Sequence, residues 1–391
     1  MTLAYGGTKT YTTLDSELMR RIHTDLDKNY RMLKLIKIVV PEWAVRLLVE
    51  SLNANPHIKT LSFVENRRTN AEDTVYQSVI SNTKHVNSMW FDACAIPARV
   101  AFAMSTVLQA SECNITSLYF FNCEFSFGTS KELGTALGKS TKITIFYMQN
   151  DHGSQHARWL PIVNGFKANR DSLEQFELID IYLTNEEMQI VFDALPSKNQ
   201  LSVLTMTGNH LHNENDLRPF NEIAFSPFAA ALKTLKYDNY LTVDSCVSLA
   251  SVMLANTTLQ KLILGTSATR RAGGLAIIEA VRHHPTLQEF GASSVPCVPL
   301  SALTTLLRHN RVLATARVTT NHIQTPEDLE ELDKALYTNP SITMLNNNHT
   351  WGHSLHMYRL VCRRNQNNNT RKNTSLFDVM RQRDCVKSIL L

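Results

Sequence analysis

The sequence predicts an α/β solenoid, a single elongated domain in which one strand-and-helix unit is repeated along the chain. An apolar pattern at positions 1, 4 and 6 of a short strand recurs at nearly constant spacing. A helical pattern separates successive strands, and no long polar linker interrupts the series. The spacing averages about 28 residues, within the range of solenoid repeats. The predicted strands begin at Tyr30, Ile58, Val86, Ile115, Ile143, Leu173, Leu201, Leu232, Leu259, Leu287, Leu313 and Ile342.

The clearest unit is Ser248–Ser267. Its first part has the apolar spacing of an amphipathic helix, and Leu259, Leu262 and Leu264 follow with the spacing of a strand. Asn-Thr-Thr between the two marks a turn. Each unit would bury its leucines against its neighbours, and 43% hydrophobic residues are ample for one continuous core.

Residues 1–14 are polar and rich in Gly and Thr, so we expect a flexible or loosely docked N-terminal arm. The solenoid is predicted over residues 15–350. It begins with a helix at about Asp15–Lys28 and a strand at Arg31–Ile38. Lys34 and Lys37 interrupt that strand, which suits the exposed edge of a sheet.

Further along, Pro219 and Pro227 predict a short or broken helix in the longest unit, and Leu300–Arg308 is predicted as a helix after a proline-marked turn. The last strand, Ile342–Leu345, runs into three asparagines, where the sheet should end. Residues 351–391 are predicted to form a C-terminal helical cap with a polar basic tail. We interpret its basic residues as solvated charge, with an anionic partner as the alternative. These residues are Arg359, Arg363, Arg364, Arg371, Lys372, Arg381, Arg383 and Lys387.

Two strand segments carry a family resemblance: Leu201–Asn209 reads LSVLTMTGN and Ile115–Cys123 reads ITSLYFFNC. Both resemble the LxxLxLxx(N/C) strand of ribonuclease-inhibitor-like leucine-rich-repeat proteins. Leu47–Asn55 and Leu329–Asn339 are similar to the LxxALxxN helix of that family. The group includes ribonuclease inhibitor, the Ran GTPase-activating protein, tropomodulin and the repeats of NOD-like receptors.

The resemblance implies a leucine-rich-repeat horseshoe of about twelve repeats of ~28 residues, with parallel strands on the concave face and helices on the convex face. The chain departs from the family at the ninth strand position of several repeats. There Ile181, Tyr240, Ser267 and Val295 replace Asn or Cys.

Composition narrows the possible partners and compartment. A net charge of +4 over 391 residues is a weak bias and speaks against nucleic acid as the main partner. Neither a secretory signal nor an apolar run long enough to span a membrane is visible, so we expect a cytoplasmic protein. The seven cysteines include no C-x-x-C pair. Several of them, Cys94 and Cys123 at strand position nine and Cys246 near a helix start, are predicted to be reduced core residues.

No motif indicates a reaction. Gly134–Ser140 resembles a phosphate-binding loop, but it has three residues between its glycines where four are needed, and it precedes a strand. Gly273–Gly274 lacks the third glycine of a nucleotide fingerprint. We expect no catalytic residue, cofactor, metal or small-molecule substrate. Histidines without neighbouring Cys or carboxylate ligands are His152, His156, His349, His353 and His356.

The most informative residues lie at strand positions 3, 5 and 7, which face away from the core. There Trp90, Tyr119, Phe121 and Tyr147 fall on three adjacent strands and are predicted to form one aromatic patch, with Ile145 beside it. Four such rings offer roughly 600–1,000 Å², comparable to one side of a standard interface. Intramolecular cover and a one-residue register shift are the alternatives. The shift would expose Met89, Phe91, Leu118, Phe120 and Phe146 instead.

Charged residues are predicted to flank the patch on the same face. Asp92, Glu177 and Asp180 lie next to it, so that its surroundings are acidic. Lys236, Lys261 and Arg317 lie further along the chain, so that the face becomes basic there. Such a gradient would orient a partner more than it would add affinity.

A non-enzymatic protein-interaction scaffold is the function that this sequence favours, with a protein partner bound on the concave face. The Ran GTPase-activating relatives imply an alternative, a GTPase-regulating protein that places Asn66, Arg67 and Arg68 beside the partner's nucleotide. A bacterial effector that acts in a host cytosol through protein binding is a third interpretation.

Overall fold

The computed structural model describes residues 8–11, 31–36, 42–64, 78–110, 113–149, 159–169, 171–181, 183–208, 231–237, 243–265, 271–292, 299–318 and 326–346. The chain forms two compact units, residues 1–204 (unit 1) and 205–391 (unit 2). Each unit is an α/β arrangement of parallel strands and helices, which fits a solenoid of the leucine-rich-repeat type.

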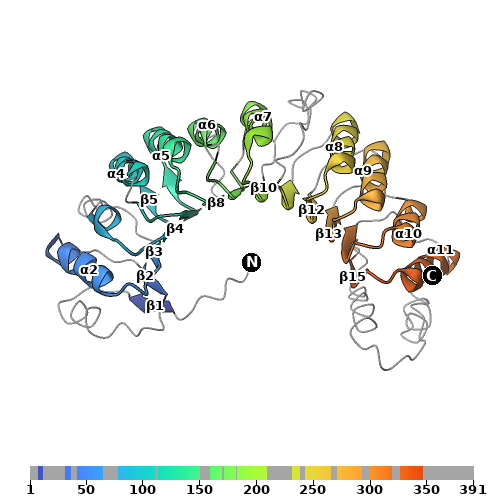
Figure 1. The fold of residues 1–391 in the computed structure, drawn as a ribbon, viewed down its shortest axis with the longest axis horizontal. Coiled ribbons are helices and arrows are strands. Elements are labelled where there is room, and N and C mark those ends of the chain that lie inside the picture. The colour runs from blue at the N-terminus through green and yellow to red at the C-terminus, as the bar shows by residue number, and fades with distance from the viewer. Residues whose placement is uncertain are drawn as a thin grey trace, which may run out of the picture. The chain divides into compact units, whose positions relative to one another are not determined.

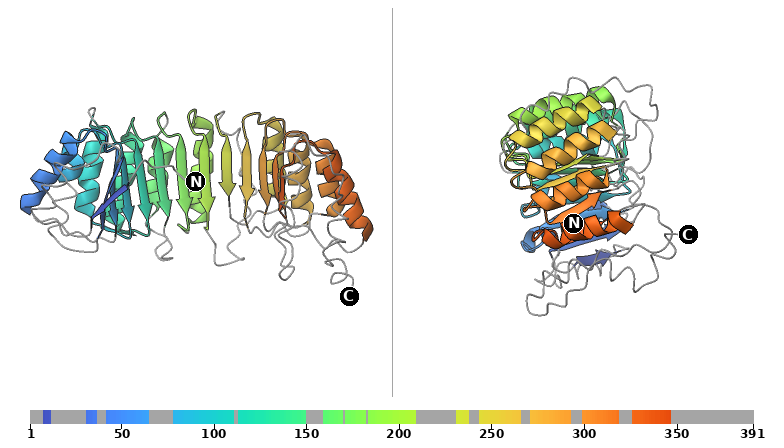
Figure 2. Two further views of the ribbon diagram at one scale, coloured as in Figure 1. Left: turned by 90° about the horizontal axis from the view of Figure 1, so that it is seen from below. Right: turned by 90° about the vertical axis from the view of Figure 1, so that its right-hand side faces the viewer.

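Unit 1 is built on a sheet with the strand order β1-β2-β3-β4-β6-β8-β9-β10, in which sequence neighbours are also spatial neighbours (Figures 1 and 2). The last strand crosses the boundary to unit 2. A short second sheet pairs β5 with β7. The strands are β1 (Thr8–Tyr11), β2 (Met32–Ile36), β3 (Thr60–Val64), β4 (Ser88–Asp92), β5 (Ala95–Ile96), β6 (Ser117–Phe121), β7 (Glu124–Phe125), β8 (Ile145–Gln149), β9 (Gln175–Ile179) and β10 (Val203–Thr207).

The described helices of unit 1 lie on one face of this sheet (Figure 1). The start of α7 is fixed by a reciprocal capping box between Thr184 and Glu187. The helices are α2 (Glu42–Ala54), α4 (Ala98–Gln109), α5 (Phe127–Lys139), α6 (Leu160–Ala168) and α7 (Asn185–Ala194), which ends in a 3₁₀ turn, η2 (Leu195–Ser197).

Unit 2 repeats the pattern with a parallel sheet in the order β11-β12-β13-β14-β15, again with its helices on one face. Its strands are β11 (Thr234–Tyr237), β12 (Lys261–Leu264), β13 (Glu289–Ala292), β14 (Thr315–Val318) and β15 (Met344–Asn346). Its helices are α8 (Val243–Ala255), α9 (Arg271–His283), α10 (Leu300–His309) and α11 (Pro326–Thr338).

The strand register follows the apolar pattern. From β2 onward, each sheet strand begins two residues after its predicted first residue, as β4 does after Val86 and β12 after Leu259. Positions 4 and 6 are buried against the helices, and Phe91 and Phe120 are fully enclosed, with relative exposure of 0%. The register shifted by one residue is therefore wrong, because it would have exposed these rings.

A row of phenylalanines on the helix side forms the centre of the unit 1 core. The ring centroids of Phe63, Phe91 and Phe120 follow one another at 5.5 and 5.4 Å, and Phe146 and Phe176 continue the row at 6.0 and 5.8 Å. Burying one such ring contributes roughly 1.5–3 kcal/mol, so this row is a major source of stability.

One expectation for the N-terminus, that of an edge strand, needs correction. Residues 8–11, part of the predicted flexible arm, form β1 and pair in parallel with β2, where Thr10 lies opposite Lys34. Because β1 pairs on one side and β3 on the other, β2 is not the edge strand that its lysines suggested. The helix predicted at Asp15–Lys28 and the C-terminal region 351–391 lie outside the described residues.

The chain turns in the same way after several strands. Position eight has left-handed backbone at Ala93, Asn122, Asp180 and Gly208, with φ between 49° and 70°. At position nine, the Cys94 thiol donates to the carbonyl of Phe63 and the Cys123 thiol to that of Phe91, both at 3.4 Å. Both cysteines are buried, as is Cys246, so the predicted core location is confirmed for these three, and Cys113 is buried as well. Burial raises the pKa of Cys246 to about 12, which keeps it a thiol at neutral pH.

The glycines of the rejected phosphate-loop motif serve helix packing. Gly134 lies inside α5, where a Cβ atom would overlap the Pro161 carbonyl of α6. Gly165 of α6 packs in return against the Gly134 carbonyl. The two helix backbones touch at this point, and only glycine fits.

At the other end of each repeat, buried amides connect successive helix C-termini. Asn169 donates to the carbonyls of Leu137 and Ser140, and Asn339 donates to those of Leu307 and Asn310. These carbonyls are the acceptors that a helix end leaves unpaired. We call this series of side chains the turn ladder.

His284 occupies a turn-ladder position in unit 2 and makes it sensitive to pH. Its Nδ1 accepts from the Thr286 amide at 3.3 Å, while its Nε2 is buried without a hydrogen-bond partner. Burial lowers the pKa of this imidazole below its usual value of about 6.5, because the charged form would be desolvated.

We expect the stability of unit 2 to fall as the pH drops below about 6.5, because the unfolded chain then binds a proton that buried His284 resists. The slope from this one group is at most about 1.4 kcal/mol per pH unit. His284→Asn introduces the residue type found at the equivalent positions Asn256, Asn310 and Asn339. It should remove the contribution of His284 to the pH dependence of the unfolding free energy. Urea unfolding at pH 5, 6 and 7 measures it. An unchanged slope in the variant would contradict the assignment, and His309→Asn, on the exposed end of α10, is the control.

Candidate functional site

The candidate site lies on the face of the unit 1 sheet opposite its helices, which we call the open face (Figure 1). Strand alternation places positions 3, 5 and 7 there, while positions 4 and 6 enter the core. In β4, Ser88, Trp90 and Asp92 are half-buried, whereas Met89 and Phe91 are buried. The same alternation holds in β8 and β9.

The four predicted rings lie together on this face, in what we call the aromatic patch (Trp90, Tyr119, Phe121 and Tyr147). Pairing places Trp90 opposite Tyr119, and Tyr119 opposite Tyr147. The ring centroids of Trp90 lie 4.3 Å from Tyr119 and 5.3 Å from Phe121. Tyr147 closes the group at 4.8 Å from Phe121 and 6.0 Å from Tyr119. The predicted continuity of the patch over three adjacent strands is confirmed.

Polar side chains on the same strands orient the rings. The indole Nε1 of Trp90 donates to Ser88 Oγ at 3.1 Å, and the Tyr147 hydroxyl donates to Gln149 Oε1 at 2.8 Å. Both partners are two residues away on the same strand and therefore on the same face. Ser88 and Gln149 were missed from the sequence, although this i, i±2 spacing could have found them.

The exposed area of the patch is smaller than predicted. Each of the four rings is half-buried, because the neighbouring rings cover much of its surface. The estimate of roughly 600–1,000 Å² counted each ring as isolated and is therefore too large. Stacking instead fixes the positions of the rings, so little side-chain freedom remains to be lost when a partner binds.

Acidic side chains border the patch at both sides. Asp92 of β4 lies opposite Phe121, and Glu177 of β9 lies opposite Tyr147. Asp180 follows at the left-handed turn after β9. Ile145, at position 3 of β8, is half-buried on the same face. Asp92, Glu177 and Ile145 thus lie on strands of the open face that carry or adjoin the aromatic patch.

Burial raises the pKa of the Tyr119 phenol, and the charge of Glu177 raises it further. A hydrogen bond with Ser117 acts in the opposite direction and lowers it.

In unit 2, the predicted basic residues are organised by a glutamate that was missed from the sequence. Glu289 of β13 binds Lys261 Nζ at 2.6 Å through Oε2, and its Oε1 lies 3.2 Å from the Arg317 guanidinium. The Glu289–Arg317 pair is an ion pair without hydrogen-bond alignment. Lys236 of β11 lies opposite Ile263, one strand away from this group. Glu289 could have been found from the sequence, because it occupies position 3 of β13, as Lys261 occupies position 3 of β12.

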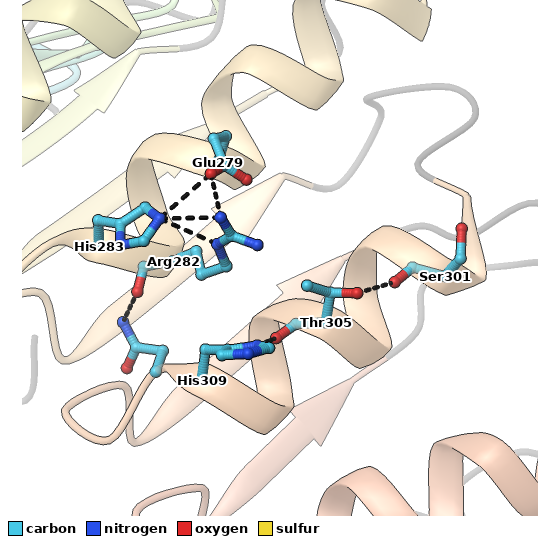
Figure 3. Close-up of polar contacts among 7 residues, drawn as sticks. Glu279, Arg282, His283, Ser301, Thr305 and His309 are labelled. Carbon is cyan, nitrogen blue, oxygen red and sulfur yellow. Dashed lines mark hydrogen bonds and ion pairs between the residues drawn. The ribbon is translucent and has the colours of Figure 1, made fainter.

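A second polar group lies on α9 and α10, where Glu279 contacts both Arg282 and His283, and His309 contacts the Thr305 carbonyl (Figure 3). These contacts join residues three or four apart on one helix, next to helix C-termini that favour basic side chains. They are explained as helix stabilisation.

Several predicted features lie outside the described residues, namely Asn66, Arg67, Arg68 and the histidines at 152, 156, 349, 353 and 356. Within the described ranges, no group of three or more His, Cys, Asp or Glu side chains is placed to hold a metal ion. None of the described helices combines the length and apolarity needed to cross a membrane.

No protein-family model and no curated protein matches the chain. Among solved structures, the Rad7–Elc1 complex of yeast matches with 11% identity over 79% of this chain and 81% of that one, at a TM-score of 0.46. The TLR13–ssRNA13 complex matches with 14% identity over 82% of this chain and 40% of that one, at a TM-score of 0.40. The actin-binding site 2 of leiomodin-1 matches with 16% identity over 58% and 93%, at a TM-score of 0.26. Matches this distant identify neither a partner nor an activity for this chain.

Proposed function

We propose that this protein is a non-enzymatic, cytoplasmic interaction scaffold, a leucine-rich-repeat horseshoe of about twelve repeats that binds a protein partner through the aromatic patch. One observation carries the proposal: four rings from three adjacent strands contact one another on the face that no described helix covers. Trp and Tyr are the residues most enriched in binding hot spots. Rings fixed by stacking and by hydrogen bonds also lose little entropy when they bind.

The other two interpretations have no comparable support. GTPase regulation depends on Asn66, Arg67 and Arg68, which the structure does not describe. Action as an effector in a host cytosol would use the same surface and differs only in the source of the partner.

Affinity capture from cytosol, followed by a dissociation constant for the purified pair, tests the proposal. Trp90→Ala/Tyr119→Ala should weaken binding by about 2 kcal/mol or more, roughly thirty-fold, because it removes the centre of the patch. Both rings are half-buried and lie outside the helix-side core, so the variant should keep its circular-dichroism spectrum.

Phe102→Ala is the matched control, because Phe102 is 60% exposed on α4, on the helix side of the sheet. It removes one exposed aromatic ring away from the patch and should leave the affinity unchanged. A folded double variant that binds the purified partner as tightly as the unmodified protein would refute the proposed function.

A further inference from the structure

The open face of unit 1 is buried at the end next to β1, although no described helix lies over it (Figure 1). All three open-face positions of β3 are buried, and so is Met32 of β2, with exposures between 4% and 7%. The open-face positions of β4, β8 and β9 are half-buried instead. Larger neighbours can bury one short side chain, as at Ser117, but the burial of Met32 together with a whole strand requires chain above the sheet. The buried residues of β3 are Thr60, Ser62 and Val64.

The topology of the strands restricts which segment can supply this cover. The strands β1, β2, β3 and β4 are parallel and follow one another across the sheet in chain order. Connections between adjacent parallel strands are right-handed in nearly all proteins, so the connections in this series pass over the same face. That face is the helix side, where α2 joins β2 to β3. Every undescribed segment within residues 12–204 belongs to such a connection, and residues 1–7 do not.

The sequence of residues 1–7, MTLAYGG, suits an extended segment that folds back over the open face. Met1, Leu3 and Tyr5 alternate with smaller residues, so an extended backbone would place these three apolar side chains on one side. A Gly-Gly pair directly precedes β1, and glycine permits the sharp change of direction that leaving the plane of the sheet requires.

The segment is also long enough to reach the aromatic patch. Thr8 lies opposite Met32, and Met32 lies opposite Thr60, so the segment meets the sheet level with the buried residues. Three strand intervals separate β1 from β4, about 14 Å in total. Five extended residues span about 17 Å, so residues 1–5 can cross β2 and β3 and end beside Trp90 of β4.

We propose that residues 1–7 of this chain lie across β2 and β3 on the open face and end at the aromatic patch. The apolar side of the segment packs on Met32, Ser62 and Val64. A protein partner then approaches the patch from the side of β6 and β8, because the segment occupies the side of β3. This consequence rests on the proposed function, whereas the cover itself does not.

Chemical labelling of an introduced thiol tests the cover without any partner. Ser62→Cys places a thiol beneath the proposed segment, and peptide mass spectrometry reads its rate of alkylation by iodoacetamide separately from the native cysteines. Deleting residues 2–5 should raise that rate at least tenfold. Gln175→Cys is the control, because it lies on the open face of β9, six strand intervals from β1 and beyond the reach of the segment. Its rate should not change, whereas a general loss of folding would raise both rates.

Two charged variants test which side of the segment faces the sheet. In the Ser62→Cys protein, Leu3→Asp/Tyr5→Asp should raise the alkylation rate at least tenfold, because burying an unpaired charge against apolar side chains is costly. Thr2→Asp/Ala4→Asp adds the same charge on the opposite side of the segment and should leave the rate unchanged.

The inference is overturned if deletion of residues 2–5 leaves the alkylation rate at position 62 unchanged, or if the two aspartate variants have equal effects. Faster alkylation on dilution of the Ser62→Cys protein would make a second copy the cover, against residues 1–7. Faster alkylation after deletion of residues 351–391 alone would likewise make the C-terminal region the cover.

Failure of this inference is distinguishable from failure of the proposed function. If Trp90→Ala/Tyr119→Ala leaves partner binding unchanged, the proposed function fails, while the alkylation rates still decide whether residues 1–7 cover the sheet. If partner binding depends on both rings and the deletion changes no rate, the scaffold function stands and the cover fails.

Discussion

Gly165→Ala is expected to destabilise unit 1 by about 3 kcal/mol, at the upper end of the usual overpacking cost. The added methyl group would overlap the Gly134 carbonyl of the neighbouring helix, an atom that cannot rotate away. Relief requires α5 and α6 to separate, and separation would also loosen the apolar side chains between them, such as Leu137 and Phe166. Urea unfolding followed by circular dichroism at 222 nm measures the loss.

Gly128→Ala provides the matched control within α5. A Cβ atom there meets its nearest neighbour, Ala98 Cβ, at an ordinary 3.4 Å. The substitution should be neutral or stabilise by up to about 1 kcal/mol, because alanine favours helix over glycine. Equal stabilities for the two variants would show that the helices can separate at little cost.

Lys198→Met is expected to cost unit 1 about 3 kcal/mol, while Lys198→Asn should cost much less. Lys198 is 1% exposed, and its ammonium donates to the carbonyls of Phe166, at 2.5 Å, and of Asn169. These carbonyls are three residues apart, as are the pairs that Asn169 and Asn339 bind. The lysine therefore occupies a turn-ladder position, and methionine would fill the space but leave those carbonyls without a donor.

The midpoints of urea unfolding, measured for both Lys198 variants and for the unmodified protein, test this prediction. Asparagine supplies the amide found elsewhere in the ladder and removes a buried charge, so it offsets the loss of the ammonium. If Lys198→Met is as stable as Lys198→Asn, the hydrogen bonds of the ammonium contribute nothing to stability and its position in the ladder has no energetic meaning.

Much of the fold was predictable because strand alternation repeats along the chain. A wrong register would expose Phe91 and Phe120 and bury Trp90, so the burial pattern allows one solution. The partners Ser88 and Gln149 follow from the same rule. The strand β1 was not predictable, because its TKTY sequence has no apolar pattern and its place depends on pairing with β2.

Other features depend on distances between elements, which a pattern of residue types does not encode. The half-burial of the patch arises from contacts between rings of neighbouring strands. The contact between Gly134 and Gly165 depends on how closely two helix axes approach. In the same way, nothing in the residue type of Lys198 indicated that its ammonium would be enclosed by carbonyls of the preceding repeat.

Because side chains alternate between the two faces of each strand, mutations on the open face and mutations on the helix side should affect different properties of the protein. Most side chains at positions 3, 5 and 7 of β4, β6 and β8 are half-buried on the face opposite the described helices, so they can be exchanged for others of similar size with little effect on the helix-side core. Ligand preference in this molecule should therefore drift quickly under selection while its thermal stability stays nearly constant. The same property makes the sheet a practical host for grafted recognition sequences, chosen one strand at a time.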